Sequence, residues 1–335
     1  MHPLFETLKQ NLSDTVSHAI RHNAAARALL IFDEQSDLAR LLTQGYQAAL
    51  PNAELLNFDA TTPAEIRQTI DTLAPGDLVV LIQSTSFRLN EFRFRLELFN
   101  RKLAVIEHPH LGRMPESEHE IYIDALAYDR DYYHSVGPAI KAHIDVAKTV
   151  AVHCEGTTLS YTGPFEPAKL NIGDYREMKN TGGQFPIGEV FTELQDLANV
   201  NGKVKVFGFG DRDFHVVFPE VPITLTIEAG MITHVENAPD EFLSILDQIR
   251  TDETLIIREL GFGMNRAMTR HRFLTDIGSY ERMCGIHLSL GGKHTIYAKA
   301  GFPKRSSMYH VDVFVDVTSV EIDGKTVFKN GGYTV

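Results

Sequence analysis

The distribution of hydrophobic residues divides the 335-residue chain into two parts with different periodicity. In the first part, short apolar runs alternate with segments that carry apolar residues at helical spacing; the runs are ARALLIFD (26–33), DLVVLI (77–82) and KLAVI (102–106). Continuous apolar runs of this length are typical of parallel strands that are buried on both faces and joined by crossover helices. We therefore predict an α/β fold that begins with an N-terminal domain, residues 1–147, built on an open α/β sheet.

From residue 148 onward the pattern changes to alternation of apolar and polar residues, interrupted by glycines, as in TVAVHCEGTTLSYTG, KVKVFGFGD and YHVDVFVDVTSVEIDG. A period of two is the signature of antiparallel strands with one face buried. Two segments, 238–250 and 265–284, have helical spacing instead, and Pro239 and Asp240 are typical of a helix start. We predict a C-terminal, mostly antiparallel β (α+β) domain, residues 148–335.

Composition and charge exclude several classes of function. The net charge is -12 and the basic residues are scattered, so the chain lacks the positive stripe that binds nucleic acid. Its two cysteines, Cys154 and Cys284, form no CxxC pair, which argues against a disulfide scaffold or a structural zinc knot. No apolar stretch has the length of a signal peptide or a membrane span. We expect a cytoplasmic protein with neither nucleic acid nor membrane as a partner.

Common catalytic motifs are missing from the sequence. The segment after the first apolar run reads FDEQSDLA rather than GxGxxG, and the sequence holds no GxSxG, HExxH or Walker A motif. Cys284 follows an apolar helical pattern and is interpreted as a packed thiol. His108 and His110 flank a proline and are interpreted as loop residues.

Five polar residues of the C-terminal part stand where a strand or a glycine-rich turn could direct them at a ligand. In YHVDVFVDV, alternation places His310 and Asp312 on one face, with Cα atoms roughly 6 to 7 Å apart. His287 leaves a strand that ends in two glycines, Glu259 precedes Gly261, and Glu189 follows Gly188. Taken singly, these residues are equally typical of a polar strand face, a core histidine or a turn acid.

Together, the segments that carry these residues resemble motifs of one family. GGQFPIGEVFTE, RELGFGMN, IHLSLG and YHVDVFVD with VEIDGKTVFKNGG resemble, in this order, motifs of the M29 family of aminopeptidases T and S. The likeness covers residues 150–335. In the first 150 residues it is limited to the general sequence pattern. It implies a homodimer and a site with two divalent ions, zinc first and cobalt or manganese as substitutes, whose ligands are Glu189, Glu259, His287, His310 and Asp312.

The chemistry of this residue set agrees with the resemblance. Three carboxylates and two imidazoles can neutralise two divalent cations and leave positions open for water. A metal-bound hydroxide could then attack an amide carbonyl. The expected activity is removal of an N-terminal residue from a small peptide, or cleavage of a related amide, with Glu189 or His294 transferring protons.

The sequence departs from the family near the substrate side of the site. His294 stands where the family has a tyrosine, and Tyr297 follows three residues later. Lys304, Arg305 and Ser306 could hold a substrate carboxylate, or they form a solvated basic turn. These departures affect the choice of substrate more than the metal site.

Two other functions remain open. Ring-cleaving dihydroxypyridine dioxygenases resemble the same fold and hold one non-haem iron, for which His287, His310 and Asp312 could serve as ligands. Retention of Glu189 and Glu259 favours hydrolysis, since a second metal needs them. An inactive relative that binds a small molecule is the third possibility, but clustered acids without a cation repel one another.

Overall fold

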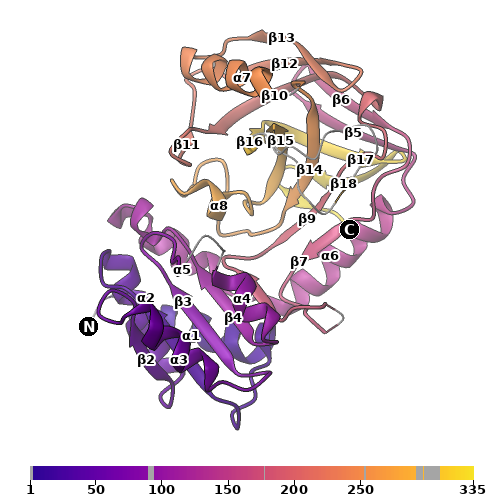
Figure 1. Ribbon diagram of the computed structural model, residues 1–335. Coiled ribbons are helices and arrows are strands. Elements are labelled where there is room, and N and C mark those ends of the chain that lie inside the picture. Colours follow the sequence, from indigo (N-terminus) through magenta and orange to yellow (C-terminus); the bar gives the residue numbers. More distant parts are fainter. Residues whose placement is uncertain (1–2, 90–93, 177, 253, 292–296, 298–309) are drawn as a thin grey trace. The chain divides into compact units, whose positions relative to one another are not determined.

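The computed structural model describes the chain except residues 1–2, 90–93, 177, 253, 292–296 and 298–309 (Figure 1). It contains two compact units, and each consists of more than one stretch of chain. The N-terminal unit comprises Met1–Asp131, Gly173–Ile187 and Leu274–Ser279; the C-terminal unit comprises Tyr132–Ile172, Gly188–Phe273 and Tyr280–Val335. The domain boundary between residues 147 and 148 stays a prediction.

The N-terminal unit is built on a five-stranded sheet in which all neighbours are parallel, in the order β2-β1-β3-β4-β8. The three predicted apolar runs form its centre, and every residue of β3 is buried. The strands are β1 (Ala28–Phe32), β2 (Glu54–Asn57), β3 (Leu78–Ile82), β4 (Ala104–His108) and β8 (Gly182–Gln184), and the helices are α1 (Phe5–Asp14), α2 (Asp37–Ala49), α3 (Pro63–Asp71), α4 (Phe94–Asn100) and α5 (His119–Ala125). The predicted N-terminal α/β fold is confirmed.

Side chains at helix starts explain where two of these helices begin. The Ser36 hydroxyl accepts a hydrogen bond from the Ala39 backbone N–H at the start of α2. Thr62 and Glu65 form a capping box at the start of α3, with Pro63 in the first turn. Such caps satisfy backbone N–H groups that have no partner within the helix.

His108 is a buried core residue at the end of β4, so its interpretation as a loop residue is wrong. Its Nε2 lies 2.7 Å from the Tyr46 hydroxyl and its Nδ1 2.9 Å from the Tyr122 hydroxyl. Burial lowers the pKa of His108 to about 3. The neutral imidazole therefore connects two buried tyrosines in the core of the N-terminal unit.

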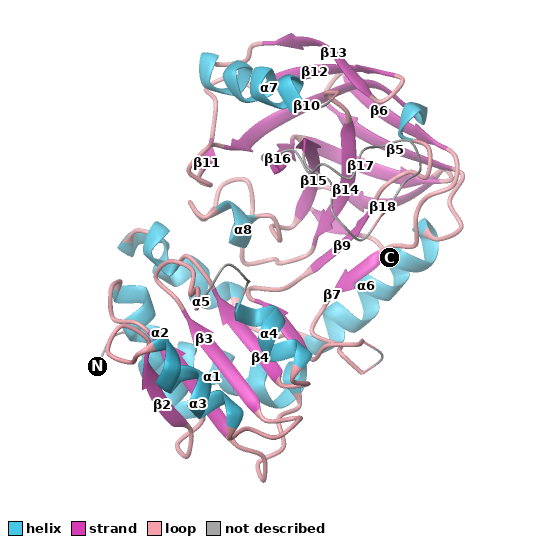
Figure 2. Cartoon of the chain, viewed as in Figure 1, coloured by secondary structure: helices cyan, strands magenta, loops and turns pink. Residues whose placement is uncertain are grey.

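The C-terminal unit is dominated by one large sheet whose pairs are antiparallel (Figure 2). The main strand order is β19-β18-β17-β5-β6-β10-β16-β15-β14-β9-β7, with β11, β12 and β13 attached through β10. The predicted β-rich C-terminal part is confirmed. Its strands are β5 (Thr149–Cys154), β6 (Thr157–Thr162), β7 (Lys169–Asn171), β9 (Glu189–Thr192), β10 (Val200–Gly210), β11 (Val216–Val217), β12 (Ile223–Glu228), β13 (Met231–Glu236), β14 (Ile257–Gly263), β15 (Gly285–Gly291), β16 (His310–Val315), β17 (Val317–Ile322), β18 (Lys325–Lys329) and β19 (Gly332–Tyr333).

One of the two predicted helices of the C-terminal part is present and the other is not. The segment 238–250 forms most of α7 (Asp240–Asp252), whereas the prediction of a helix over 265–284 is wrong, because only α8 (Ile277–Tyr280) is helical there. The other residues of this segment make backbone hydrogen bonds that are not helical. Thr269 and Arg272 bond to each other, and Asn265 forms an isolated β-bridge with Met283. A further helix, α6, spans Arg130–Ile144. Within the described chain, no helix is long and apolar enough to cross a membrane.

Candidate metal centre

Four neighbouring strands of the C-terminal unit carry all five predicted metal ligands. β9 pairs with β14, β14 with β15, and β15 with β16. In this register Glu189 lies opposite Gly263, and His287 lies opposite Gly261. Glu259 lies where the register between β14 and β15 shifts, and its carboxylate turns to the same side as His287, since the two side chains are 3.4 Å apart. Residues nearly 100 positions apart in the sequence are thereby brought to one face by strand pairing.

The structure brings Glu189, Glu259 and His287 into one buried group. One potential ligand atom from each lies within 4.8 Å of the others. His287 Nε2 is 3.2 Å from Glu189 Oε1 and 3.4 Å from Glu259 Oε1. Each of the three side chains is less than one tenth exposed. Two carboxylates and an imidazole that converge in this way are a ligand set for a divalent cation.

Gly261 makes room for the imidazole of His287. A Cβ atom at position 261 would lie 2.1 Å from both Cε1 and Nε2 of the His287 ring, far inside van der Waals contact. The glycine after Glu259 in RELGFG therefore permits the histidine of the neighbouring strand to lie flat against the backbone. This is a close approach of side chain to backbone, which glycine alone allows.

The two glutamates change the protonation of the histidine between them. Burial disfavours the imidazolium, but hydrogen bonds to Glu189 and Glu259, together with the charges of Glu189 and Asp312, outweigh it and raise the pKa of His287 to about 10. Burial also acts to raise the pKa of Glu189, yet the Arg282 guanidinium and His287 outweigh it and lower that pKa. A bound divalent cation would displace the proton from His287, because imidazole ligates metals in its neutral form.

The two remaining predicted ligands, His310 and Asp312, form a pair on β16. His310 Nε2 is 3.1 Å from Asp312 Oδ1, and Asp312 is buried while His310 is about one third exposed. Burial would raise the pKa of Asp312, but the neighbouring positive charges of His310 and His287 outweigh it and lower that pKa. Asp312 also acts electrostatically on Glu189 and His287. The pair thus lies beside the three-residue group.

Three supporting residues were not anticipated from the sequence. The Ser289 hydroxyl accepts a hydrogen bond of 3.1 Å from the Glu259 backbone N–H. Arg258 Nε donates to the Gly291 carbonyl at 2.8 Å, and Arg282 Nε lies 3.9 Å from Glu189 Oε2. Alternation could have indicated Ser289, which shares a strand face with His287. Arg282 carried no signal, because its segment was assigned to a helix.

The predicted residues near the substrate lie partly outside the described chain. His294, Lys304, Arg305 and Ser306 fall in ranges that the structure does not describe. Tyr297 is described, and its hydroxyl is 3.1 Å from the Pro167 carbonyl oxygen and 3.3 Å from that of Phe191. The Tyr297 hydroxyl is therefore engaged with backbone groups. Its expected role as the substitute for the family tyrosine stays a prediction.

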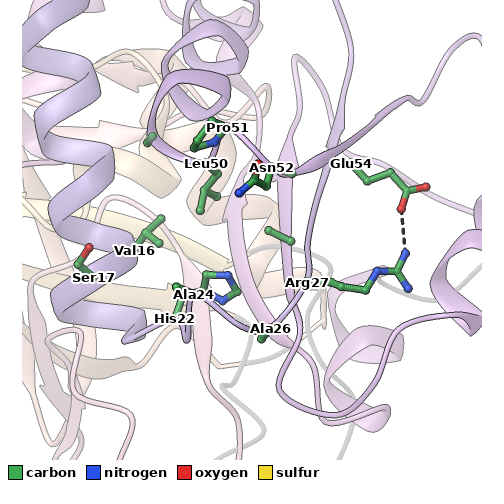
Figure 3. Close-up of a pocket in the computed structure, with 13 residues that line it drawn as sticks. Val16, Ser17, His22, Ala24, Ala26, Arg27, Leu50, Pro51, Asn52 and Glu54 are labelled. Carbon is green, nitrogen blue, oxygen red and sulfur yellow. Dashed lines mark hydrogen bonds and ion pairs between the residues drawn. The ribbon is translucent and has the colours of Figure 1, made fainter.

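A cavity of about 500 Å³ lies in the N-terminal unit and involves none of these residues (Figure 3). Alanines make up much of its lining, together with Leu50 and Pro51. Its charged residues, Arg27 and Glu54, pair with each other at 2.9 Å. With no cluster of metal-ligating side chains among its lining residues, this cavity is a poor candidate for the metal chemistry.

Comparison with known proteins gives similarity in structure only. No family model matches the sequence, and no curated protein matches it. The fold is similar to that of 2,5-dihydroxypyridine dioxygenase from Pseudomonas putida KT2440, with a TM-score of 0.66 and 15% identity over 98% of this chain and 97% of the other. It is also similar to wild-type AmpT from Thermus thermophilus, with a TM-score of 0.61 and 14% identity over 99% of this chain and all of the other. The expected likeness to aminopeptidase T is confirmed at the level of the fold.

Proposed function

We propose that this protein is a metal-dependent aminopeptidase that removes N-terminal residues from small peptides. The observation that carries the proposal is the buried convergence of Glu189, Glu259 and His287 beside the His310–Asp312 pair. A ring-cleaving dioxygenase would need two histidines and one carboxylate to hold its iron, whereas this site has three carboxylates. The two buried glutamates are most simply explained as ligands of a second ion.

The residues fit a pair of divalent ions, with zinc first and cobalt or manganese as substitutes. The donor set is mixed nitrogen and oxygen, which suits these metals. Three buried carboxylates need positive charge beside them; Arg282 and the two histidines supply it here, and divalent ions would supply it in place of the histidine protons. Gly261 adds a geometric argument, because it permits the imidazole to take this position beside the two glutamates.

Each residue has a distinct part in the proposed reaction. Bound divalent ions would polarise the scissile carbonyl and lower the pKa of a bound water. Glu189, kept ionised by Arg282, would accept the proton of the attacking water and return it to the leaving amine; His294 is the other proton-transfer candidate. Ser289 would hold the backbone at Glu259 in place, so that its carboxylate keeps its orientation.

Elemental analysis of the purified protein tests this proposal. The wild type is expected to hold about two zinc, cobalt or manganese ions per chain and to hydrolyse aminoacyl amides. Glu259→Gln should lose metal and activity together, because the carboxylate is a ligand. Glu321→Gln is the matched control, since Glu321 is a partly exposed acid on β17 of the same sheet. A wild-type chain that is free of metal and insensitive to chelators would contradict the proposal.

Ring cleavage by a single non-haem iron is the second candidate, and the fold likeness to the dioxygenase favours it. His287, His310 and Asp312 would then hold the iron, with open positions for oxygen and substrate. In that case the protein would contain about one iron that survives Glu259→Gln, and it would consume oxygen with a dihydroxypyridine. The expected homodimer is likewise a proposal, and light scattering of the purified protein tests it.

A further inference from the structure

A chain of hydrogen bonds connects the side chain of Tyr333, on β19, with the backbone at Glu189. The Tyr333 hydroxyl donates to the Gly263 carbonyl oxygen at 2.7 Å. The same peptide group contains the Met264 N–H, which donates to the Gly188 carbonyl oxygen at 2.8 Å. That carbonyl belongs in turn to the peptide bond between Gly188 and Glu189. Two peptide groups therefore lie between the phenol and a proposed metal ligand.

The Tyr333 hydroxyl also contacts the strand that carries His287. Its oxygen is 3.4 Å from the Gly285 carbonyl oxygen, and Gly285 precedes His287 by two residues on β15. In the register of β14 and β15, Gly285 lies opposite Gly263, which in turn lies opposite Glu189 on β9. The hydroxyl is therefore located where the strands of both ligands meet β14.

Gly263, whose carbonyl accepts the Tyr333 hydrogen bond, has no room for a side chain. A Cβ atom at this position would lie 2.0 Å from the Met283 carbonyl oxygen and 2.9 Å from the Arg282 carbonyl carbon. The backbone of Arg282 and Met283 therefore packs directly against β14, as it can only against a glycine. Arg282 Nε is 3.9 Å from Glu189 Oε2. Arg282 thus faces the carboxylate of Glu189, whereas Tyr333 is connected to its backbone.

Tyr333 is itself held in place by the neighbouring strand. It pairs with Phe328 of β18, and the centroids of the two rings are 5.1 Å apart. The Thr334 backbone N–H donates to the Val327 carbonyl oxygen at 2.9 Å. Burial raises the pKa of the Tyr333 phenol well above its usual range, and Glu189 is among the groups that add to this effect. The phenol therefore keeps its proton and remains a hydrogen-bond donor.

We propose that Tyr333 is a positioning residue of the metal centre, whose hydroxyl fixes the backbone from which Glu189 and His287 reach the metal. This inference rests on the proposed function and adds to it a residue outside the ligand set. Consecutive hydrogen bonds in a protein interior polarise and strengthen one another, so the phenol acts on the Glu189 peptide through the intervening group. Metal ligands tolerate deviations of only about 0.2 Å in their distances. A loosened backbone at Glu189 therefore weakens metal binding.

Cobalt binding by Tyr333→Phe tests this role, because the variant loses only the hydroxyl and keeps the packed ring. The visible absorption spectrum of bound cobalt reports the geometry of its ligands, which a purely structural role of Tyr333 would leave unchanged. We expect a shifted spectrum and about ten-fold weaker cobalt binding, the lower end of the range for groups that orient metal ligands. Placing p-aminophenylalanine at position 333 restores an N–H donor and should recover the wild-type spectrum and affinity.

Tyr161→Phe is the matched control, because it removes the same group from another buried tyrosine. Tyr161 lies on β6 of the same sheet and is fully buried. Burial raises the pKa of its phenol, and no charged group in the described part of the chain contributes to that effect. Its cobalt spectrum and affinity should equal those of the wild type, and circular dichroism shows whether each variant is folded.

A folded Tyr333→Phe variant with the wild-type cobalt spectrum and affinity would overturn the inference, even if it unfolds at a lower urea concentration. Hydrolysis of aminoacyl p-nitroanilides separates this failure from failure of the proposed function. If Tyr333→Phe alters the cobalt spectrum but the wild type hydrolyses no anilide, the aminopeptidase proposal fails and the role of Tyr333 stands. If the wild type hydrolyses anilides and both proteins share one spectrum, only the inference fails. A wild type that binds no cobalt would refute both.

Discussion

Replacing Gly261 by alanine should abolish tight metal binding, although none of the proposed ligand residues is substituted. The added Cβ would lie 2.1 Å from Cε1 and Nε2 of His287, whereas ordinary contact begins at 3.4 Å, so the ring must withdraw by about 1.3 Å. Zinc ligands tolerate deviations of only about 0.2 Å from their normal bond lengths. The imidazole would therefore leave the coordination sphere, or the strand would have to move with it.

The expected loss of metal affinity is at least as large as that for disturbing groups behind the ligands, about 10- to 100-fold. The steric cost to stability should be about 1 to 3 kcal/mol, as for other overpacked core sites. Gly332→Ala is the matched control, because Gly332 lies in β19 of the same sheet and a Cβ there meets nothing within 4 Å. It should bind metal as the wild type does.

Metal titration with a competing chelator gives the affinities, and circular dichroism shows whether each variant is folded. The double variant Gly261→Ala/His287→Asn should bind no more weakly than His287→Asn alone, because the glycine acts only through the histidine. The reasoning is refuted if folded Gly261→Ala binds metal with wild-type affinity. It is equally refuted if the two substitutions prove independent and additive.

Three further predictions concern protonation and a buried carboxylate. In chelator-treated protein the pKa of His287 is raised from 6.5 to about 10, so the stability that its protonation contributes is complete below pH 6.5 and is lost as the pH rises toward 10. Between these pH values, urea unfolding should show the free energy of unfolding falling by about 1.4 kcal/mol per pH unit. His287→Asn should remove this slope. The pKa of His108 is lowered to about 3, so stability should instead fall as the pH drops below 6.5, and nuclear magnetic resonance should find a neutral His108 ring at pH 5. Asp276 is fully buried and accepts hydrogen bonds from Arg113 at 2.8 Å and from Ser279. Asp276→Asn should therefore lower the free energy of unfolding, measured in urea, by about 3 kcal/mol. A decrease below about 1 kcal/mol would contradict this prediction.

The elements that were predicted correctly from the sequence are the strands whose own residues form a continuous apolar run. β1, β3 and β4 are apolar runs, and β3 is buried along its whole length. The strands β2 and β8 were not anticipated. β2 reads ELLN with only Leu56 buried, and β8 reads GGQ, so neither has an apolar pattern to detect. They are strands because a neighbouring strand offers backbone partners, which is a tertiary effect.

The candidate ligands could be named from local motifs, but their arrangement could not. Glu189 and Gly263 lie opposite each other because β9 pairs with β14 across more than 70 residues, and no local pattern contains that register. The place of Arg282 beside Glu189 is another consequence of tertiary structure, since helical spacing around it predicted a helix that is absent. Gly261 follows Glu259 in its motif, but the histidine that packs against it comes from the neighbouring strand.

The division of the N-terminal unit into three stretches of chain has a consequence for synthesis on the ribosome. Arg113 and Glu118 find their partners Asp276 and Thr275 in the last of these stretches. At about 5 to 20 residues per second, a ribosome needs roughly 7 to 30 s to pass from the first stretch to the end of the third. Until then Arg113 and Glu118 lack these partners in the nascent N-terminal unit. The unit whose translation begins first is thus complete only when residue 279 has been made.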